Sequence, residues 1–298
     1  MIGVFDSGSG GLTVLRALRD QLPERDFVYL GDHRHAPYGA RRADQIEALT
    51  QAGVARLFGL GCGLVIIACN TAAAVALQPL QRNWLPTAWP DRKVLGVVAP
   101  MVESVAGVRW NGTPSRRRNG PPILTLGVFA TTRTVLTCVW RRRIRARARG
   151  VTVVQQQCPG LAVMIERGAP AADIDAAVRR FTAGLLGRLD RAPDAVVLGC
   201  THYPLIADRF AAALPATTRI LDQPATIARS LAAYLERHPQ CDRVGRPGHT
   251  DYYTTGDPVA AGVPAARFLG EPVTFFPIYG APDAPRATLR LAGAGRTA

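Results

Sequence analysis

The chain has 298 residues and a formal net charge of +14, and 35 of its 36 cationic side chains are arginines, with Lys93 as the only lysine. Hydrophobic residues make up 48% of the sequence and charged residues 19%, which excludes a disordered chain, because such chains combine low hydrophobicity with high charge. Glycine and proline follow no period, and no apolar run reaches the roughly 18 residues of a membrane-spanning helix, so collagen-like and membrane-spanning classes are excluded as well.

Short apolar runs alternate with longer segments of helical character, which is typical of β-α-β units around parallel sheets. In chain order, the predicted strands are residues 2–5, 27–30, 64–68, 94–98, 123–128, 151–155, 195–199 and 219–221. The predicted helices are residues 12–21, 43–60, 72–85, 132–149, 173–189, 205–214 and 225–237. The chain is expected to begin with a core strand rather than a signal peptide. Residues 110–122 predict an exposed loop or insertion, and the end of the chain is expected to be poorly ordered.

Two pairs of similar segments indicate that the chain has two related halves. Residues 3–7 (GVFDS) correspond to 127–131 (GVFAT), and residues 65–71 (VIIACNT) correspond to 196–202 (VVLGCTH). We therefore expect two related α/β domains with mainly parallel sheets that face each other across an interdomain cleft. The first would comprise residues 1–98 plus 207–298, and the second residues 99–206. Ligands of such sheets bind beyond the carboxyl ends of the strands, so Cys69 and Cys200 are expected at this edge, one per half.

Two thiols on opposite walls of a cleft predict proton transfer between two bases. Cys200 has His202 two positions later, and Asp6 at the end of the first strand can assist Cys69. A substrate between the thiols would lose a proton on one face and regain it on the other, which inverts the stereocentre. A single covalent cysteine nucleophile is the alternative chemistry, but it leaves the second cysteine without a role. Buried structural cysteines are also common.

The residues around these cysteines favour a small polar ligand rather than a cofactor. Residues 8–11 (GSGG) match the dinucleotide fingerprint only in part, because Thr13 occupies its third glycine position. A helix N-terminus of this kind binds any anion, including a carboxylate. Uncharged donors surround it in the predicted cleft: Ser7, Tyr38, Gly39, Asn70, Thr71 and Thr201. Lys93 directly precedes a strand, which disfavours a Schiff-base cofactor, and neither a cofactor nor a metal is expected.

Four motifs in this order resemble the glutamate racemases of the cofactor-independent aspartate/glutamate racemase family. They are residues 5–14 (FDSGSGGLTV), 31–32 (GD) with 36–39 (APYG), 68–72 (ACNTA) and 198–205 (LGCTHYPL), and the resemblance continues into 254–258 and 268–270. It implies an isomerase that interconverts L- and D-glutamate without a cofactor. Such an enzyme supplies D-glutamate for peptidoglycan, and thereby for cell-wall biogenesis and cell shape.

The resemblance also implies roles for individual residues. Cys69 would take the proton from D-glutamate and Cys200 the proton from L-glutamate, with Asp6 and His202 assisting their respective thiols. Glu166 would be the further acidic residue of the site. The implied substrate-binding residues are Asp6, Ser7, Tyr38, Gly39, Asn70, Thr71, Thr132, Thr134, Thr201 and His202. Asp6 and Thr132 could instead cap the helices that follow them, and Glu166 could be an exposed charge at a helix end.

The sequence also allows other substrates and partners. A racemase acting on aspartate or another small acidic amino acid is one alternative. The arginines at positions 116–118 and within residues 141–149 suggest a second, a non-catalytic binder of nucleic acid. A solvated helix face explains the basic stretch more simply, so a nucleic-acid partner is not expected. Six cysteines without a secretion signal indicate a reducing compartment, the cytoplasm. The family resemblance is compatible with a homodimer.

Overall fold

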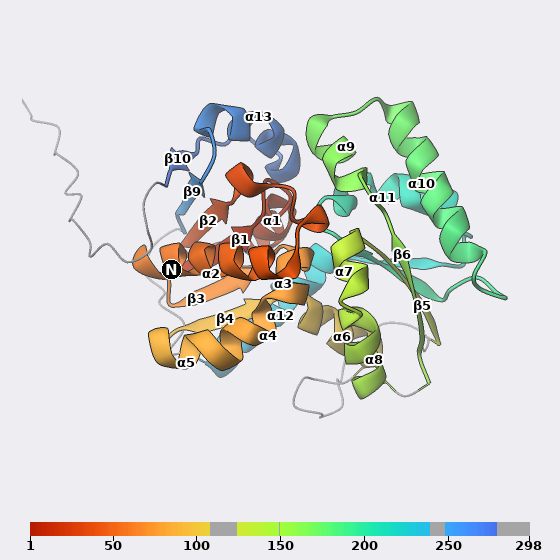
Figure 1. Ribbon diagram of the computed structural model, residues 1–298, viewed down its shortest axis with the longest axis horizontal. Coiled ribbons are helices and arrows are strands. Elements are labelled where there is room, and N and C mark those ends of the chain that lie inside the picture. Colours follow the sequence, from red (N-terminus) through yellow and green to blue (C-terminus); the bar gives the residue numbers. More distant parts are fainter. Residues whose placement is uncertain (108–123, 149, 239–247, 279–298) are drawn as a thin grey trace, which may run out of the picture.

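The computed structural model describes residues 1–107, 124–148, 150–238 and 248–278 (Figure 1). Within them, ten strands form two sheets that lie side by side, each flanked by helices (Figure 1). Every strand pair in both sheets is parallel. This confirms the predicted α/β class with two parallel sheets.

The first sheet has six strands in the order β10-β9-β2-β1-β3-β4. Their bounds are β1 (Ile2–Asp6), β2 (Phe27–Gly31), β3 (Leu64–Ile67), β4 (Lys93–Gly96), β9 (Thr250–Thr254) and β10 (Phe276–Pro277). The central strands β1, β2 and β3 are buried throughout, as their unbroken apolar sequences predict. Asp6 pairs with Gly31, so β1 and β2 end at the same edge of the sheet.

The second sheet has four strands in the order β6-β5-β7-β8. Their bounds are β5 (Thr125–Ala130), β6 (Thr152–Gln157), β7 (Ala195–Gly199) and β8 (Arg219–Leu221). Ala130 at the end of β5 pairs with Gly199 and with Gln157, so the turns after β5, β6 and β7 share one edge. That edge faces the first half of the molecule (Figure 1).

Helices connect the strands and cover the sheets. In the first half they are α1 (Leu12–Gln21), α2 (Ala43–Gly59), α3 (Asn70–Val75), α4 (Leu77–Pro79), α5 (Leu85–Ala88) and α13 (Pro258–Leu269). The others are α6 (Val98–Ala106), α7 (Thr132–Leu136), α8 (Val139–Arg147), α9 (Leu161–Arg167), α10 (Ala171–Leu186), α11 (Ala207–Ala213) and α12 (Gln223–Arg237). Single helical turns are found at His33–His35, Tyr38–Ala40 and Tyr203–Ile206. Helix α12 follows the second sheet but packs against α1 and α6.

Two predicted helices are interrupted, and both have a local cause. The helix predicted at 132–149 is divided into α7 and α8 at Cys138, which has a left-handed backbone with φ of 53°. Thr137 Oγ1 donates to Thr134 O and accepts from Val139 N–H, which replaces regular helical hydrogen bonds. The helix predicted at 72–85 is divided into α3, α4, a π-helical segment (Leu80–Trp84) and α5. Pro79 in α4 and Pro86 in α5 each lack the N–H that a continuous helix would need.

Several elements were not predicted, and one strand lies in a different half than expected. The elements α6, α9, β9, α13 and β10 were missing from the sequence prediction, and β9 pairs with β2 along its whole length. β8, in the range 207–298 that we expected in the first domain, pairs with β7 of the second sheet. The predicted insertion at 110–122, the arginines at 116–118 and Arg149 lie outside the described residues.

Candidate active site

A cavity of about 960 Å³ lies between the facing edges of the two sheets. Cys69 directly precedes α3 in the turn after β3, and Cys200 directly follows β7. Both thiols line this cavity, together with Glu166 and His202. Other residues predicted for the site also line it: Ser7, Tyr38, Gly39, Asn70, Thr71, Thr132 and Thr201. Parallel strands from two sheets therefore bring both cysteine turns to one space, as the internal repeat suggested.

Cys69 occupies the N-terminal cap of α3. Its Sγ accepts a hydrogen bond from Ala72 N–H at 3.4 Å and lies 3.5 Å from Ser7 Oγ. Burial, and in second place the nearby Asp6 carboxylate, raise the pKa of the Cys69 thiol to about 12. Cys69 is therefore a neutral thiol, ready to donate a proton.

Asp6 is completely buried at the end of β1, behind the cavity wall rather than in it. Its carboxylate accepts from Gly8 N–H at 2.9 Å, from Ser7 Oγ at 3.4 Å and from Thr201 Oγ1 at 3.2 Å. Burial raises the pKa of Asp6 to about 6, although His202 and the hydrogen bonds from Gly8 and Thr201 oppose the shift. Ser7 Oγ lies within reach of both Asp6 and Cys69, so it connects the carboxylate with the thiol.

Cys200, His202 and Glu166 form a connected row on the opposite side. Cys200 Sγ lies 3.8 Å from His202 Nδ1, and His202 Nε2 is hydrogen-bonded to Glu166 Oε2. Burial lowers the pKa of His202, but the bonds to Cys200 and Glu166 outweigh it and raise the pKa well above its usual value. Burial likewise opposes ionisation of Glu166, yet the His202 contact lowers the Glu166 pKa to about 2. The pair is therefore an imidazolium and a carboxylate, and the imidazolium lies beside Sγ of Cys200.

Hydroxyl groups connect the two halves next to Cys69. Thr71 Oγ1 lies 2.9 Å from Thr131 Oγ1 and 3.2 Å from Thr134 Oγ1. Thr134 is completely buried and lies behind the cavity wall, whereas Thr132 lines it. Thr131 was missed as a site residue, although the repeat pairs it with Ser7 and could have identified it.

Tyr38 is held by a buried carboxylate. Its hydroxyl donates to Asp32 Oδ2 at 2.6 Å, and Thr255 Oγ1 donates to Asp32 Oδ1 at 2.5 Å. Burial and the adjacent Asp32 raise the pKa of Tyr38, which keeps its hydroxyl protonated. The turn that carries Tyr38 and Gly39 is therefore fixed at the rim of the cavity.

Further cavity residues were not singled out from the sequence. They include His33, Arg34, Cys158, Arg167 and Asp257. Cys158 directly follows β6, so the rule that ligands bind at the carboxyl ends of strands could have identified it. His33 and Arg34 lie in the turn after β2, between two motifs that were recognised. Within residues 1–107, 124–148, 150–238 and 248–278, no cluster of three His, Cys, Asp or Glu side chains is arranged to hold a metal ion.

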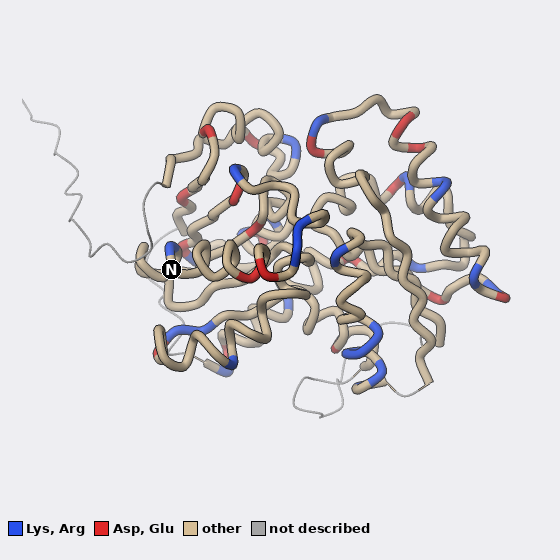
Figure 2. The backbone as a smooth tube through the Cα atoms, viewed as in Figure 1, with Lys and Arg blue, Asp and Glu red and all other residues tan. Residues whose placement is uncertain are grey.

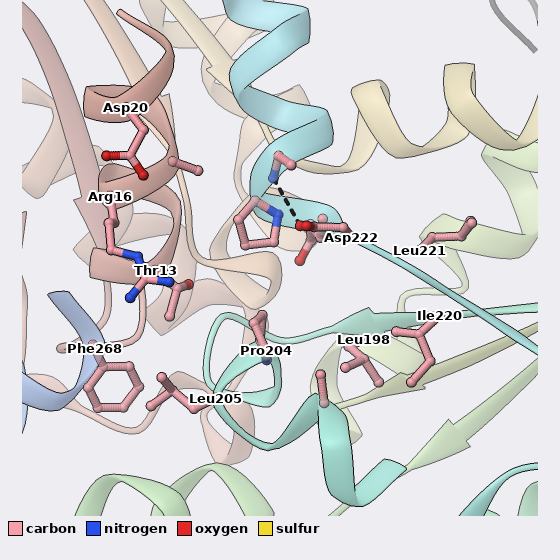
Figure 3. A pocket seen from close by; sticks show the side chains of 15 residues that line it. Thr13, Arg16, Asp20, Leu198, Pro204, Leu205, Ile220, Leu221, Asp222 and Phe268 are labelled. Atoms are coloured by element: carbon pink, nitrogen blue, oxygen red, sulfur yellow. Dashed lines mark hydrogen bonds between the residues drawn. The ribbon is translucent and has the colours of Figure 1, made fainter. Parts of the chain in front are cut away.

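A second cavity has a volume of about 540 Å³ (Figure 3). Its walls come from α1, from β7 and β8, and from the start of α12, where Asp222 caps the helix by accepting from Ala225 N–H (Figure 3). Thr13 in its wall donates to Thr201 O at 3.0 Å, next to Cys200. Gln223 in its wall exchanges two hydrogen bonds with Asn70, next to Cys69, at 2.9 and 3.0 Å. Both cysteine turns are thus supported from this side.

The arginines of α8 do not line either cavity. They follow one another along the helix at the periphery of the second half (Figure 2). Burial, together with Arg142, Arg82 and Arg147, lowers the pKa of Arg143, so these cations lie close together. Across the described parts of the chain, no helix is both long and apolar enough to span a membrane.

Comparison with known proteins places this geometry among the amino-acid racemases. The family model described as Asp/Glu/Hydantoin racemase matches residues 2–231. The chain is 45% identical over 281 residues to a glutamate racemase of Phenylobacterium zucineum, covering 93% of this chain and 99% of that protein. It is also 45% identical over 279 residues to one of a Caulobacter species, covering 92% and 98%.

Two solved structures share the fold over nearly their whole length. The crystal structure of a glutamate racemase from Bacillus anthracis superimposes with a TM-score of 0.80 at 27% identity, covering 96% of this chain and 98% of that one. The glutamate racemase of Francisella tularensis, solved in complex with D-glutamate, gives a TM-score of 0.79 at 25% identity, covering 95% and 97%.

Proposed function

The chain belongs to the Asp/Glu/hydantoin racemase family, and from this premise we propose that it interconverts L-glutamate and D-glutamate. The observation that carries the proposal is that two free thiols, each in the turn after a strand of a different sheet, line one cavity. This arrangement suits removal of the α-proton by one thiolate and its replacement from the opposite face by the other thiol. The reaction needs no cofactor.

In the L to D direction, Cys200 is the base and Cys69 is the acid. Cys200 as a thiolate takes the α-proton of L-glutamate, and the neutral Cys69 gives its own proton to the other face of Cα. The products are D-glutamate, a Cys200 thiol and a Cys69 thiolate. The imidazolium of His202, held by Glu166, stabilises the Cys200 thiolate before the transfer.

The D to L direction uses the same groups in reverse. Cys69 has to be a thiolate before it can take the proton of D-glutamate, and burial raises its pKa to about 12. Asp6 can accept that proton through Ser7 Oγ, which lies 3.5 Å from the sulfur. Burial raises the pKa of Asp6 to about 6, which makes it a suitable base near neutral pH.

The carbanion-like state is the costly one, because an α-proton is weakly acidic. Uncharged donors of the cavity, among them Ser7, Asn70 and Thr71, can hold the substrate carboxylates and spread the developing charge. Arg34 and Arg167 also line the cavity and favour a substrate that carries two carboxylates. This charge distribution supports glutamate as the substrate.

We expect the purified protein, without an added cofactor, to move deuterium from heavy water into the α-position of both enantiomers of glutamate. Cys69→Ala and Cys200→Ala should each reduce racemisation by at least about 100-fold, because each removes one proton-transfer group. Cys138→Ala, outside the cavity, is the matched control and should retain activity. The measurement is circular dichroism of glutamate together with proton NMR. A fully active Cys69→Ala or Cys200→Ala protein would rule out the two-base reaction, and a panel including aspartate tests the substrate.

The biological setting follows from the activity as a proposal. The enzyme supplies D-glutamate for peptidoglycan, and it works in the cytoplasm, in accord with the five free thiols in the described residues.

We place the boundary of its second domain after β8 rather than at residue 206, because β8 completes the second sheet. A homodimer is compatible with this fold, and the mass of the purified protein in solution would decide it.

A further inference from the structure

His33 lies in the turn after β2, and contacts with three residues hold its ring. Its Nδ1 lies 2.9 Å from Thr254 Oγ1 and 3.2 Å from Gly31 O, and its ring makes an edge contact with Phe275 at 5.3 Å between centroids. A Cβ at position 31 would lie 2.3 Å from His33 Cε1, so only glycine leaves room for the ring. These contacts give the imidazole one orientation.

The contact with Gly31 O assigns the ring proton to Nδ1, because a carbonyl oxygen can only accept. Thr254 Oγ1 then accepts from Nδ1 as well. Burial lowers the pKa of His33, which keeps the ring neutral and leaves Nε2 as an acceptor. Nε2 lies 3.0 Å from Ser9 Oγ, which therefore donates to it.

Ser9 connects His33 to the acidic residue of the site. Ser9 is completely buried between β1 and α1, and its backbone N–H donates to Glu166 Oε1 at 3.4 Å. The other oxygen, Oε2, contacts His202, which lies next to Cys200. The preceding carbonyl, Gly8 O, accepts from Tyr29 OH at 2.6 Å, so this turn is held from the first sheet at two points.

We propose that His33 is a positioning residue for the Cys200 half of the reaction, since its neutral ring fixes the Ser9 turn that holds Glu166 against His202. The proposal rests on the proposed racemase function, because it assigns His33 to one of the two proton transfers. Loss of the Ser9 contact frees Glu166 to rotate, and the imidazolium then no longer faces Sγ of Cys200. Cys69 is held by Ser7 and Ala72 and does not contact the row formed by Cys200, His202 and Glu166.

Three variants separate the hydrogen bond from the bulk of the ring. In His33→Gln the amide reaches about as far as Nε2 and can still accept from Ser9 Oγ, whereas in His33→Asn it reaches only as far as Nδ1. Ser9→Ala removes the hydroxyl and keeps the backbone N–H. His249→Asn is the matched control, because this imidazole is exposed and its ring is hydrogen-bonded to Asp251.

We expect His33→Asn and Ser9→Ala each to lower kcat/KM by between about 10- and 100-fold, in the range known for a misplaced catalytic group. The kcat/KM of the double variant should be no lower than that of the less active single variant, because both changes break the same contact. His33→Gln should stay within about three-fold of the wild type. Additive losses in the double variant, or equal losses in His33→Gln and His33→Asn, would overturn the proposal.

Isotope effects distinguish positioning from general damage. The equilibrium constant of a racemase is one, so kcat/KM has to fall equally in both directions and cannot reveal which thiol is affected. In the His33→Asn protein the primary effect of α-deuteration on kcat/KM should rise for L-glutamate and fall for D-glutamate. Unchanged isotope effects on kcat/KM for both enantiomers, or an isotope effect that rises for D-glutamate alone, would contradict a role at Cys200.

A second readout does not depend on racemisation. The alkylation rate of Cys200 by iodoacetamide, followed by peptide mass spectrometry at pH 7, should fall about ten-fold or more in His33→Asn and Ser9→Ala, whereas the rate of Cys69 should not change. Equal Cys200 rates in all proteins would refute the role of His33. If the wild-type protein did not racemise glutamate but the two variants still showed this loss of Cys200 reactivity, only the proposed function would be refuted.

Discussion

The two carboxylates near the cysteines have opposite pKa shifts for a clear physical reason. Asp6 is enclosed by apolar strands and neutral donors, so burial dominates and raises its pKa to about 6. Glu166 is also buried, but its direct bond to the imidazole of His202 lowers its pKa to about 2. One carboxylate can therefore exchange a proton near neutral pH, while the other stays charged.

The raised pKa of Asp6 predicts a cost to stability that a single substitution removes. The folded state binds the Asp6 proton more tightly than the unfolded state does, so stability falls as the pH rises from about 4 to 6. Asp6→Asn should therefore raise the free energy of unfolding at pH 8 by up to about 3 kcal/mol, with no gain below pH 4, and should impair catalysis. Urea unfolding at both pH values measures this. Asp190→Asn, at an exposed position, is the control, and a gain of equal size at pH 3.5 would contradict the explanation.

At the level of elements, α9 and α13 approach each other (Figure 1), and residues of both helices line the cavity. Arg267 on α13 donates from Nη2 to Glu166 O at 2.5 Å, at the carboxyl end of α9. A cation at this end satisfies a free helix carbonyl and suits the helix dipole. The adjacent Gly168 has a φ of 67°, and a Cβ there would lie 2.6 Å from Arg267 Nη1. The contact therefore ties the two halves together next to Glu166.

Arg267→Ala should raise KM for both enantiomers about three-fold with a smaller change in kcat, because a partly exposed hydrogen bond contributes roughly 0.5–1 kcal/mol. Arg267→Lys should recover part of the loss, since an ammonium group can reach the same carbonyl. Steady-state kinetics provide the measurement, and Arg229→Ala on the surface of α12 is the control. An unchanged KM in Arg267→Ala would show that the contact does not contribute to substrate binding.

Across the whole molecule, α12 links the two halves. It follows β8 of the second sheet, packs against α1, and begins with Gln223, whose amide pairs with that of Asn70. Both amides are buried, so their hydrogen bonds replace those to water. The turn of Cys69 is thereby connected to the segment that leaves the second sheet.

Gln223→Leu should lower the free energy of unfolding by about 1–3 kcal/mol, because it leaves the buried Asn70 amide without its partner. For a chain of this size the melting temperature should fall by roughly 2–4 °C per kcal/mol, measured by calorimetry. Gln21→Leu at an exposed position is the control. If the double variant Asn70→Leu/Gln223→Leu were less stable than Gln223→Leu, the amide pairing would not be the source of the loss.

The sequence by itself determined the fold class, both cysteine turns and the family, because these depend on local patterns. Apolar runs predict buried strands, as for β7, whose predicted bounds match the structure. The repeat places Cys69 and Cys200 at equivalent strand ends. The interruption between α7 and α8 escaped the prediction, because it depends on the local hydrogen bonds of Thr137.

Only the tertiary structure decided which distant side chains meet. Glu166 contacts His202 from 36 residues away, Ser9 contacts Glu166 from 157 residues away, and Gln223 contacts Asn70 from 153 residues away. No local pattern encodes such pairs, since they arise from how two sheets and their connecting helices pack. That packing also determines the pKa values of Asp6 and Glu166, because burial and neighbouring charges exist only in the folded protein.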